Sequence, residues 1–427
     1  NVPFAMVWSA YLLVKSFVSL SWLIRASARK LRYILSVTSG NVNRSKSLCL
    51  LMTLASDTYF KKGVNIQVFI GQMMKIFILT DLMYSGQHRD MQWFIESAKF
   101  EDIEFTYEPE YWNLHNYDWD SYDALYCIID HRDGYEDSPE FVEQLHKRME
   151  LLKQNGFKFI LARPWESAEN VANSKFYDII KEFDYNKWFG GTTWFWYWMR
   201  EKHRDNKLEV SHDHNGSYWH KIHEFLYLNK APRKHRVKLY NKLKEANVLD
   251  NSIYTFTMLD EPIRLDKKYE LPGIDPKDYP RFGKDQDIYE LPYVDTVCSI
   301  VSETNDNDHD VFMTEKIWKP IMAQHVFIVH GNYLYLQKLR EMGFKTFGNY
   351  FDESYDLERD PSKRIDKIVS LCKDLKDDSK ELKHGHKKWQ DMYLQTKALR
   401  QHNYDVFWND ELYERAVQKT VLEFLGI

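Results

Sequence analysis

The sequence predicts an α/β protein with two Rossmann-like domains that face each other across a cleft, followed by a helical carboxyl-terminal tail. Two observations support this prediction. Short apolar segments rich in β-branched residues alternate with amphipathic helical patterns from Lys75 onward. The alternation stops in a polar stretch at residues 201–223 and begins again at Phe225. Strands that alternate with helices form parallel sheets, and the restart of the pattern indicates a second sheet.

The first domain is expected at residues 74–210 and begins with the strand KIFILTD. Its other predicted elements are a helix at 91–100, strands at 103–107 and 124–130, a helix at 140–155 and a strand at 157–162. The second domain is expected at residues 211–385. It is predicted to hold a strand at 225–228, a helix at 233–246, a strand at 252–257, the strand TVCSIVSE, a helix from Thr314, the strand HVFIVHG and a helix at 361–375. Residues 386–427 have a helical pattern and form the predicted tail.

Composition narrows the class of protein. The formal net charge of −5 argues against general nucleic-acid binding. The charge is uneven, because residues 1–73 hold nine basic residues and one acidic residue, while the rest holds 49 basic and 62 acidic residues. The four cysteines are widely spaced and form no C-x-x-C motif, which favours buried free thiols in a reducing compartment: Cys49, Cys127, Cys298 and Cys372.

Residues 1–73 differ in composition from the rest and are predicted to be an extension outside the fold. Residues 4–24 have the length of a membrane span but include Lys15, and a cluster of basic residues follows them. By the positive-inside tendency, that cluster would keep the downstream chain in the cytoplasm. The extension is interpreted as sequence translated upstream of a start at Met73-Met74, as a membrane-associated segment, or as a soluble helical segment. We expect a cytoplasmic protein that could associate with membranes only through residues 4–24.

The stretch at residues 301–331 is the strongest candidate for a site. A strand, a polar loop, a helix and a second strand follow one another, with Glu303, Glu315 and Lys316 gathered at the carboxyl end of the first strand. In open α/β sheets this end is where ligands bind, and a lysine at a helix N-terminus suits a phosphate. Arg233 and Arg236 lie one helical turn apart at the start of another helix in the same domain. As patterns alone, both segments also fit ordinary helix starts on a solvated surface.

Three blocks within residues 157–350 resemble α1,3-fucosyltransferases. The family motif F-E-N-S, a polar loop, Y-[VI]-T-E-K and an apolar strand ending in glycine is similar to the stretch from Val301 to Gly331. The family also has a strand that ends in V-S-N, an arginine a few residues later, and then a helix that reads K-Y-Y-N-E-L. The segment from Leu226 to Leu243 is similar to this arrangement. A family strand followed by E-S-P is similar to the strand followed by Trp165-Glu166-Ser167.

The resemblance implies a GT-B glycosyltransferase that is inverting, metal-independent and without a cofactor. It would move a sugar, as from GDP-fucose, to the hydroxyl of a glycan acceptor. It implies that Arg236 and Lys316 bind the donor diphosphate, with Arg233 as a further donor-binding candidate. It also implies that Glu303 and Glu315 contact the donor's sugar or ribose, and that Glu166 is the catalytic base. Departures from the motifs leave the donor sugar open: Thr304, Phe312, a longer loop before Glu315, and Lys319-Pro320.

Other interpretations of the same sequence stay open. Asp130-His131-Arg132-Asp133 competes with Glu166 for the role of the base. Asp306 and Asp308 form a D-x-D pair, which would suit a metal-dependent glycosyltransferase, although the segment is more typical of a solvated loop. The histidines at 212, 214, 220 and 223 are interpreted as linker residues, and the aromatic run at 188–199 as packing or as an acceptor platform. A non-catalytic nucleotide- or sugar-binding module is the alternative from another functional class.

Overall fold

The structure is a computed structural model that describes residues 73–82, 87–129, 139–163, 182–189, 191–205, 223–269, 287–288, 290–307, 311–377 and 387–427. Residues Met73–Ile427 form one compact unit. The predicted extension lies outside the described residues, apart from Met73. The predicted domain boundaries near residues 210 and 385, and the cleft between the two domains, stay predictions.

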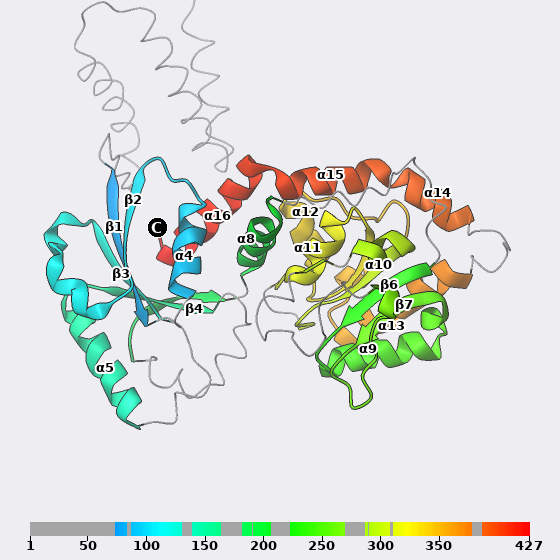
Figure 1. The fold of residues 1–427 in the computed structure, drawn as a ribbon, viewed down its shortest axis with the longest axis horizontal. Helices are drawn as coiled ribbons and strands as arrows, with labels where there is room; N and C mark the ends of the chain where they lie inside the picture. Colours follow the sequence, from blue (N-terminus) through cyan, green and yellow to red (C-terminus); the bar gives the residue numbers. More distant parts are fainter. Residues whose placement is uncertain are drawn as a thin grey trace, which may run out of the picture. The chain divides into compact units, whose positions relative to one another are not determined.

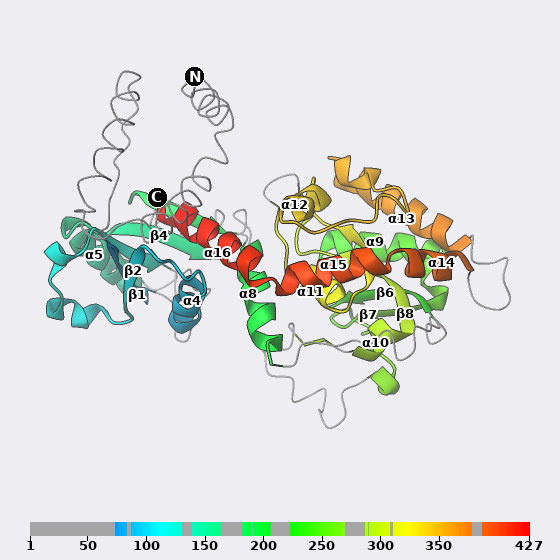
Figure 2. The same ribbon diagram turned by 90° about the horizontal axis from the view of Figure 1, so that it is seen from above.

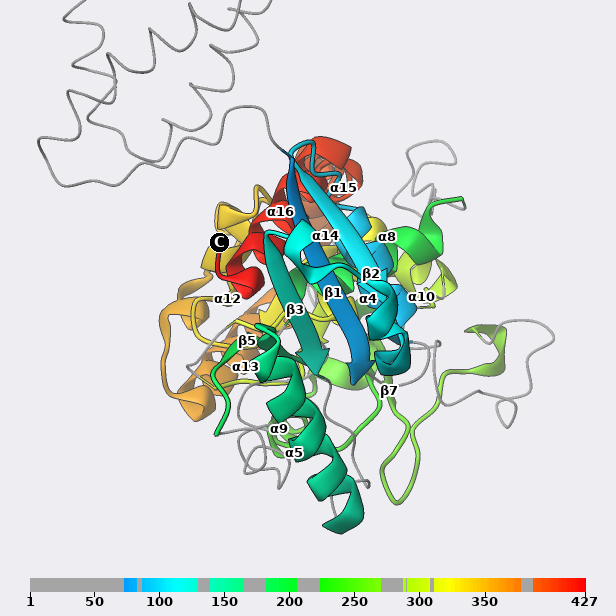
Figure 3. The same ribbon diagram turned by 90° about the vertical axis from the view of Figure 1, so that its left-hand side faces the viewer.

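The first sheet has five strands in the order β2-β1-β3-β4-β5. They are β1 (Met74–Leu82), β2 (Ile103–Glu108), β3 (Ala124–Ile129), β4 (Lys158–Arg163) and β5 (Tyr185–Phe189), and every neighbouring pair is parallel. Figure 3 shows β1, β2 and β3 running in the same direction. Strand β5, at the edge of the sheet, was not predicted from the sequence.

Alternate residues of β1 are buried on opposite faces of this sheet. Phe77 and Leu79 join a cluster that includes residues of helix α5 (Pro139–Gln154), while Ile76 and Ile78 join a cluster that includes residues of helix α4 (Gln87–Glu96). In a strand, successive side chains point to opposite faces, so helices on both faces require apolar residues at every position. This is why β1 contains a continuous apolar run, IFIL at residues 76–79, rather than an alternating one.

The second sheet has four parallel strands in the order β7-β6-β8-β9. They are β6 (His223–Asn229), β7 (Ser252–Phe256), β8 (Thr296–Ser302) and β9 (Val326–His330). All residues of β8 and β9 are buried, as expected for parallel strands covered on both faces, although β9 lies at the edge of the sheet. The α/β class with two parallel sheets is therefore confirmed.

The remaining helices are α8 (Thr192–His203), α9 (Lys234–Glu245), α10 (Glu290–Asp295), α11 (Glu315–Met322), α12 (Tyr335–Glu341), α13 (Pro361–Asp377), α14 (Lys387–Gln395), α15 (Lys397–Trp408) and α16 (Asp410–Leu425). Short 3-10 turns lie at Tyr111–Asn116, Trp119–Ser121, Val248–Asn251, Lys267–Tyr269 and Ser354–Leu357. The predicted helical tail is confirmed in α14, α15 and α16 (Figure 1). Among the described residues, no helix has both the length and the apolar character that crossing a membrane requires.

The tail helices connect elements that are distant in sequence. Helix α15 contacts α11, the helix between β8 and β9, whereas α16 contacts α4, β5 and α8 (Figure 2). Tyr126 of β3 donates a hydrogen bond to the carbonyl oxygen of Leu425 at 2.9 Å. The tail thus completes the core next to both sheets instead of extending from it.

Helix α8 was not predicted from the sequence, and neither were the short helices α10 and α12. Residues Trp194 and Trp196 of α8 are at most 1 % exposed. The Trp196 ring stacks on Trp318 of α11 with centroids 5.5 Å apart, and its Nε1 donates to the Phe407 carbonyl at 3.1 Å. The part of the aromatic run that lies in α8 is therefore packing, the first of the two interpretations considered above. Cys127, Cys298 and Cys372 are free and buried, as predicted, and Cys49 lies outside the described residues.

Candidate functional site

The candidate site lies at the carboxyl ends of β6, β8 and β9, which are neighbours in the second sheet. Ser302, the last residue of β8, is in register with His330, the last residue of β9. Helix α9 begins a few residues after β6 ends, and α11 begins after the loop that follows β8. Because the strands are parallel, both helix starts are brought to the same edge of the sheet.

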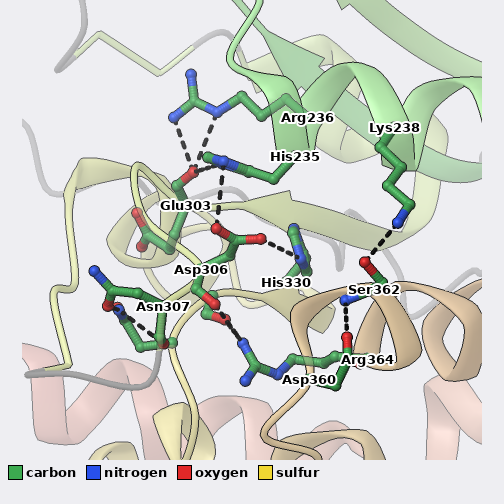
Figure 4. A network of polar contacts seen from close by, with 12 residues as sticks. His235, Arg236, Lys238, Glu303, Asp306, Asn307, His330, Asp360, Ser362 and Arg364 are labelled. Atoms are coloured by element: carbon green, nitrogen blue, oxygen red, sulfur yellow. Dashed lines mark hydrogen bonds and ion pairs between the residues drawn. The ribbon is translucent and has the colours of Figure 1, made fainter.

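Arg236, in the first turn of α9, ties this helix to the end of β8. Its Nε and Nη2 donate to the backbone carbonyl oxygen of Glu303 at 3.1 and 3.0 Å, and His235 Nε2 lies 3.0 Å from the same oxygen (Figure 4). The Arg236 side chain is buried, and burial together with nearby Arg233 lowers its pKa. A guanidinium remains charged in proteins, so Arg236 holds a positive charge beneath the surface of the site.

Arg233 lies one turn before Arg236 and is exposed. Its Nη1 donates to the backbone carbonyl oxygen of Thr304 at 3.3 Å, on the residue that follows Glu303. Both predicted arginines therefore reach the same two residues after β8, one from a buried position and one from the surface.

Glu303 is fully buried, and its carboxylate bonds to groups of its own domain. Oε1 accepts from the Thr314 backbone N–H at 3.1 Å and from the Tyr335 hydroxyl at 2.7 Å, and Oε2 accepts from Thr314 Oγ1 at 2.6 Å. Burial and the Glu303 charge raise the pKa of Tyr335 well above its ordinary value, so the tyrosine keeps its proton and donates. The carboxylate connects the end of β8 with the starts of α11 and α12.

Glu315 and Lys316 are the first two residues of α11, directly after the cap residue Thr314. The Thr314 side chain accepts from the Lys316 backbone N–H, and Lys316 Nζ lies 3.0 Å from Thr314 Oγ1 and 2.6 Å from Glu315 Oε1. Burial alone would raise the pKa of Glu315, but Lys316 and Lys319 outweigh it and lower the pKa. The lysine side chain is 25 % exposed, so Lys316 is a partly accessible cation paired with a charged glutamate.

Asp306, in the loop after β8, faces two histidines. Its Oδ1 lies 3.6 Å from His235 Nδ1, and its Oδ2 lies 3.8 Å from His330 Nε2 (Figure 4). Arg364 of α13, itself buried, donates to the Asp306 carbonyl oxygen at 2.9 Å. The Asp306 side chain is thus 23 % exposed, so this part of the loop is only partly solvated. Asp308 lies outside the described residues.

Sequence reasoning missed the two histidines of the site. His235 could have been noticed because it stands between Arg233 and Arg236, and His330 because it ends a buried strand. Within the described part of the chain, no group of three or more His, Cys, Asp and Glu side chains is arranged to hold a metal ion. The structure brings together five of the six predicted site residues: Arg233, Arg236, Glu303, Glu315 and Lys316.

The sixth, Glu166, lies outside the described residues, as do the competing segment at 130–133 and the histidines at 212, 214 and 220. His223 is the first residue of β6, and its Nδ1 lies 3.2 Å from Asn251 Oδ1.

The arrangement suits an anionic ligand. Two helices begin at this edge, and Arg233, Arg236 and Lys316 supply cations from both of them. Exposed backbone N–H groups and cations at helix starts stabilise phosphate groups. The carboxylate of Glu303 is occupied by three internal donors, whereas Glu315 is held by Lys316.

The chain was compared with protein families, curated proteins and solved structures. No protein-family model matches the chain, and no curated protein matches it. The chain is similar to a crystal structure of α1,3-fucosyltransferase, with 12 % identity and a TM-score of 0.38, covering 82 % of this chain and 95 % of that one. It is also similar to the crystal structures with GDP and with GDP-fucose, each at 12 % identity and a TM-score of 0.33. The coverage is 82 % of this chain and 95 % of that one with GDP, and 81 % and 94 % with GDP-fucose. These structures bear the name of the family that the sequence motifs resemble.

Proposed function

We propose that the protein is an inverting, metal-independent glycosyltransferase that moves a sugar from a nucleotide-diphosphate sugar to a hydroxyl of a glycan acceptor. The observation that carries the proposal is the meeting of Arg233, Arg236 and Lys316 at adjacent strand ends, in the segments whose motifs resemble fucosyltransferases. Glycosyl transfer leaves negative charge on the departing diphosphate, and fixed cations at that point lower the barrier. GDP-fucose is the first donor to test, on the strength of the motifs.

The contacts and the exposure of the three cations suggest a different role for each kind. Arg233 is exposed and Lys316 is partly exposed, so we assign them the direct contacts to the diphosphate. Arg236 donates to the Glu303 carbonyl and is buried, so we assign it the task of holding the strand end and adding positive charge from behind. For Lys316 to bind a phosphate, its Nζ would leave Glu315 or share it, which frees the Glu315 carboxylate for a hydroxyl of the donor.

The acceptor hydroxyl must also lose a proton, and we assign this step to Glu166. A carboxylate opposite the leaving diphosphate would remove the proton as the hydroxyl attacks, and attack from that side inverts the anomeric centre. Asp133 is the alternative base. Cytoplasmic location, a glycan acceptor and the absence of nucleic-acid binding complete the proposal.

Binding of GDP, UDP, CDP and ADP, measured by calorimetry, tests the donor site. Arg233→Ala and Lys316→Ala should each weaken the preferred diphosphate by about 1.5–3 kcal/mol, the range for hydrogen bonds to charged groups. Two surface cations serve as matched controls: Arg415→Ala removes an arginine paired with Glu411 on α16, and Lys338→Ala a lysine 3.8 Å from Glu341 on α12. Unchanged affinity in both site variants would refute the location of the site.

A sugar-transfer assay distinguishes the proposed enzyme from a non-catalytic binding module and from a metal-dependent transferase. A protein that binds the diphosphate but transfers no sugar to any acceptor would be a binding module. Transfer that is lost with a chelator and restored with a divalent cation would favour the metal-dependent alternative with Asp306 and Asp308.

A further inference from the structure

A second feature of the site involves His235, Asp306 and His330. They come from three elements: the first turn of α9, the loop after β8 and the end of β9. The rings of the two histidines lie with centroids 5.5 Å apart, and the Asp306 carboxylate faces a nitrogen of each ring (Figure 4). The cluster adjoins the proposed diphosphate site, because His235 stands between Arg233 and Arg236 in sequence.

The contacts of His235 determine which nitrogen carries its hydrogen when the ring is neutral. Nε2 lies 3.0 Å from the Glu303 carbonyl oxygen, which can only accept, so Nε2 must be the donor. Nδ1 then has a lone pair, and it faces Asp306 Oδ1 at 3.6 Å, beyond hydrogen-bond length. Two acceptors therefore face each other. A proton on Nδ1 would turn this contact into a charge-assisted hydrogen bond.

His330 keeps a fixed state beside them. It is fully buried, and neither ring nitrogen has a hydrogen-bond partner among the described residues. Burial, followed by the effects of His235, Arg364 and Arg236, holds the pKa of His330 well below its ordinary value. His330 is therefore neutral across the physiological range, so we assign any proton taken up by this pair of rings to His235.

Several charges act on His235. Burial lowers its pKa, Asp306 and the Glu303 carbonyl raise it, and Arg236 and Arg233 lower it, with a net lowering. Glu303 itself contributes through its carbonyl, since its carboxylate bonds to Thr314 and Tyr335. The same arginines that disfavour a proton on His235 are those proposed to hold the diphosphate. A bound diphosphate would offset their charge and make protonation easier.

We propose that His235, with Asp306 as its partner, is a proton-dependent positioning residue of the diphosphate site, which takes up a proton as the diphosphate binds. This inference rests on the proposed function. When it is protonated, the His235–Asp306 bond fixes the loop after β8 against α9, and the imidazolium adds a third positive charge beside the two arginines. The departing diphosphate would then be stabilised most in the protonated protein.

The sign of the pH dependence follows by linkage. Diphosphate binding raises the pKa of His235, so the complex holds more protons than the free protein in the window between the two pKa values. Affinity is constant above that window, rises as the pH falls through it, and levels off below it. Because free His235 has a pKa under its ordinary value, the window begins below the ordinary pKa of histidine. The gain is about tenfold in Kd for each unit by which binding raises the pKa.

The test compares the wild type with His235→Gln between pH 5.5 and 8, using the tightest binder of the four nucleoside diphosphates. Glutamine keeps a donor for the Glu303 carbonyl but does not titrate in this range. His402→Gln is the matched control, because His402 Nε2 also lies 3.0 Å from a backbone carbonyl oxygen, that of Gly343. The ligand's own phosphate titrates too, but it does so equally with all three proteins and cancels in the comparison.

We expect affinity to rise toward acidic pH in the wild type and in His402→Gln, relative to His235→Gln. Calorimetry in buffers of different ionisation enthalpy should show proton uptake that His235→Gln lacks. NMR of the His235 ring should show a higher pKa with diphosphate than without, and Asp306→Asn should lower the pKa in both states. This last variant keeps the test decisive if His235→Gln does not fold.

Two results would overturn the inference: an equal pH dependence of binding in wild type and His235→Gln, or a His235 ring that titrates identically with and without diphosphate. Both leave the proposed function in place, because diphosphate still binds. Absence of binding of any diphosphate at every pH would instead refute the proposed function, and the inference with it.

Discussion

Replacing Glu303 with alanine should destabilise the protein, because this carboxylate is fully buried and accepts three hydrogen bonds. Alanine would leave the Thr314 backbone N–H without its acceptor, along with the hydroxyls of Thr314 and Tyr335. Each hydrogen bond to a charged group contributes about 1.5–3 kcal/mol, but such values do not add fully. The hydroxyls can turn toward other acceptors and the backbone N–H cannot. We therefore expect a loss of about 3–5 kcal/mol in the free energy of unfolding, the range for a broken buried charged contact.

Glu303→Gln is the matched variant. Its amide oxygen can accept from the Thr314 N–H and the Tyr335 hydroxyl, while its amide nitrogen donates to Thr314 Oγ1, which can turn to accept. Only the extra strength of the charge is lost, so we expect a cost of about 1 kcal/mol. Urea unfolding, followed by circular dichroism, measures both changes within a total stability that is typically about 5–15 kcal/mol.

The same pair of variants tests the donor contact that the family resemblance implies for Glu303. If the carboxylate serves only the fold, Glu303→Gln should bind the diphosphate and its sugar nearly as well as the wild type. The reasoning would be refuted by a Glu303→Ala protein that is as stable as the wild type and has lost donor binding. Glu303 would then be a ligand group.

Three further predictions follow from the site and the chain. Below about pH 6.5 the unfolded chain protonates the histidine at position 330 while the folded chain does not. The free energy of unfolding should therefore decrease as the pH falls below that value, by up to about 1.4 kcal/mol per pH unit. His330→Gln should show a shallower decrease in urea titrations, and equal slopes would contradict this prediction. Glu166→Gln should keep diphosphate affinity and lose turnover by roughly 10²–10⁴-fold in a transfer assay, whereas normal turnover together with an inactive Asp133→Asn would move the base to residues 130–133. A truncated chain beginning at Met74 should unfold cooperatively on heating, because residues Met73–Ile427 form one compact unit; aggregation of that chain alone would show that the preceding residues belong to the fold.

The sequence was sufficient for most strands and for both helix starts of the site. The apolar runs of β1, β8 and β9 are buried on both faces, so their composition alone indicates parallel strands covered by other elements on both sides. The start of α11 was readable because Thr314 caps it and charged residues follow. These features depend on residues near one another in sequence, which is why a local pattern predicts them.

Of the elements that were not predicted, strand β5 and helix α8 escaped for opposite reasons. Strand β5, YNKWF, is a short edge strand with polar residues, so it lacks the apolar run of its neighbours. Helix α8 is buried on several sides by aromatic residues, so it has no polar face to reveal a helical period. Trp196, for example, stacks on Trp318, more than a hundred residues away in sequence, and such a contact leaves no local pattern.

The sequence by itself determined which residues reach the edge of the second sheet, since parallel strands place their carboxyl ends together. Only the tertiary structure decided what each side chain does there. Glu303 and Lys316 look alike as charged residues near a strand end, but one is fully buried by Thr314 and Tyr335 and the other is partly exposed. His235, Asp306 and His330 meet from three elements. The physical reason is that periodicity reports which face of an element is buried, whereas hydrogen bonding and charge depend on the atoms that another element places opposite.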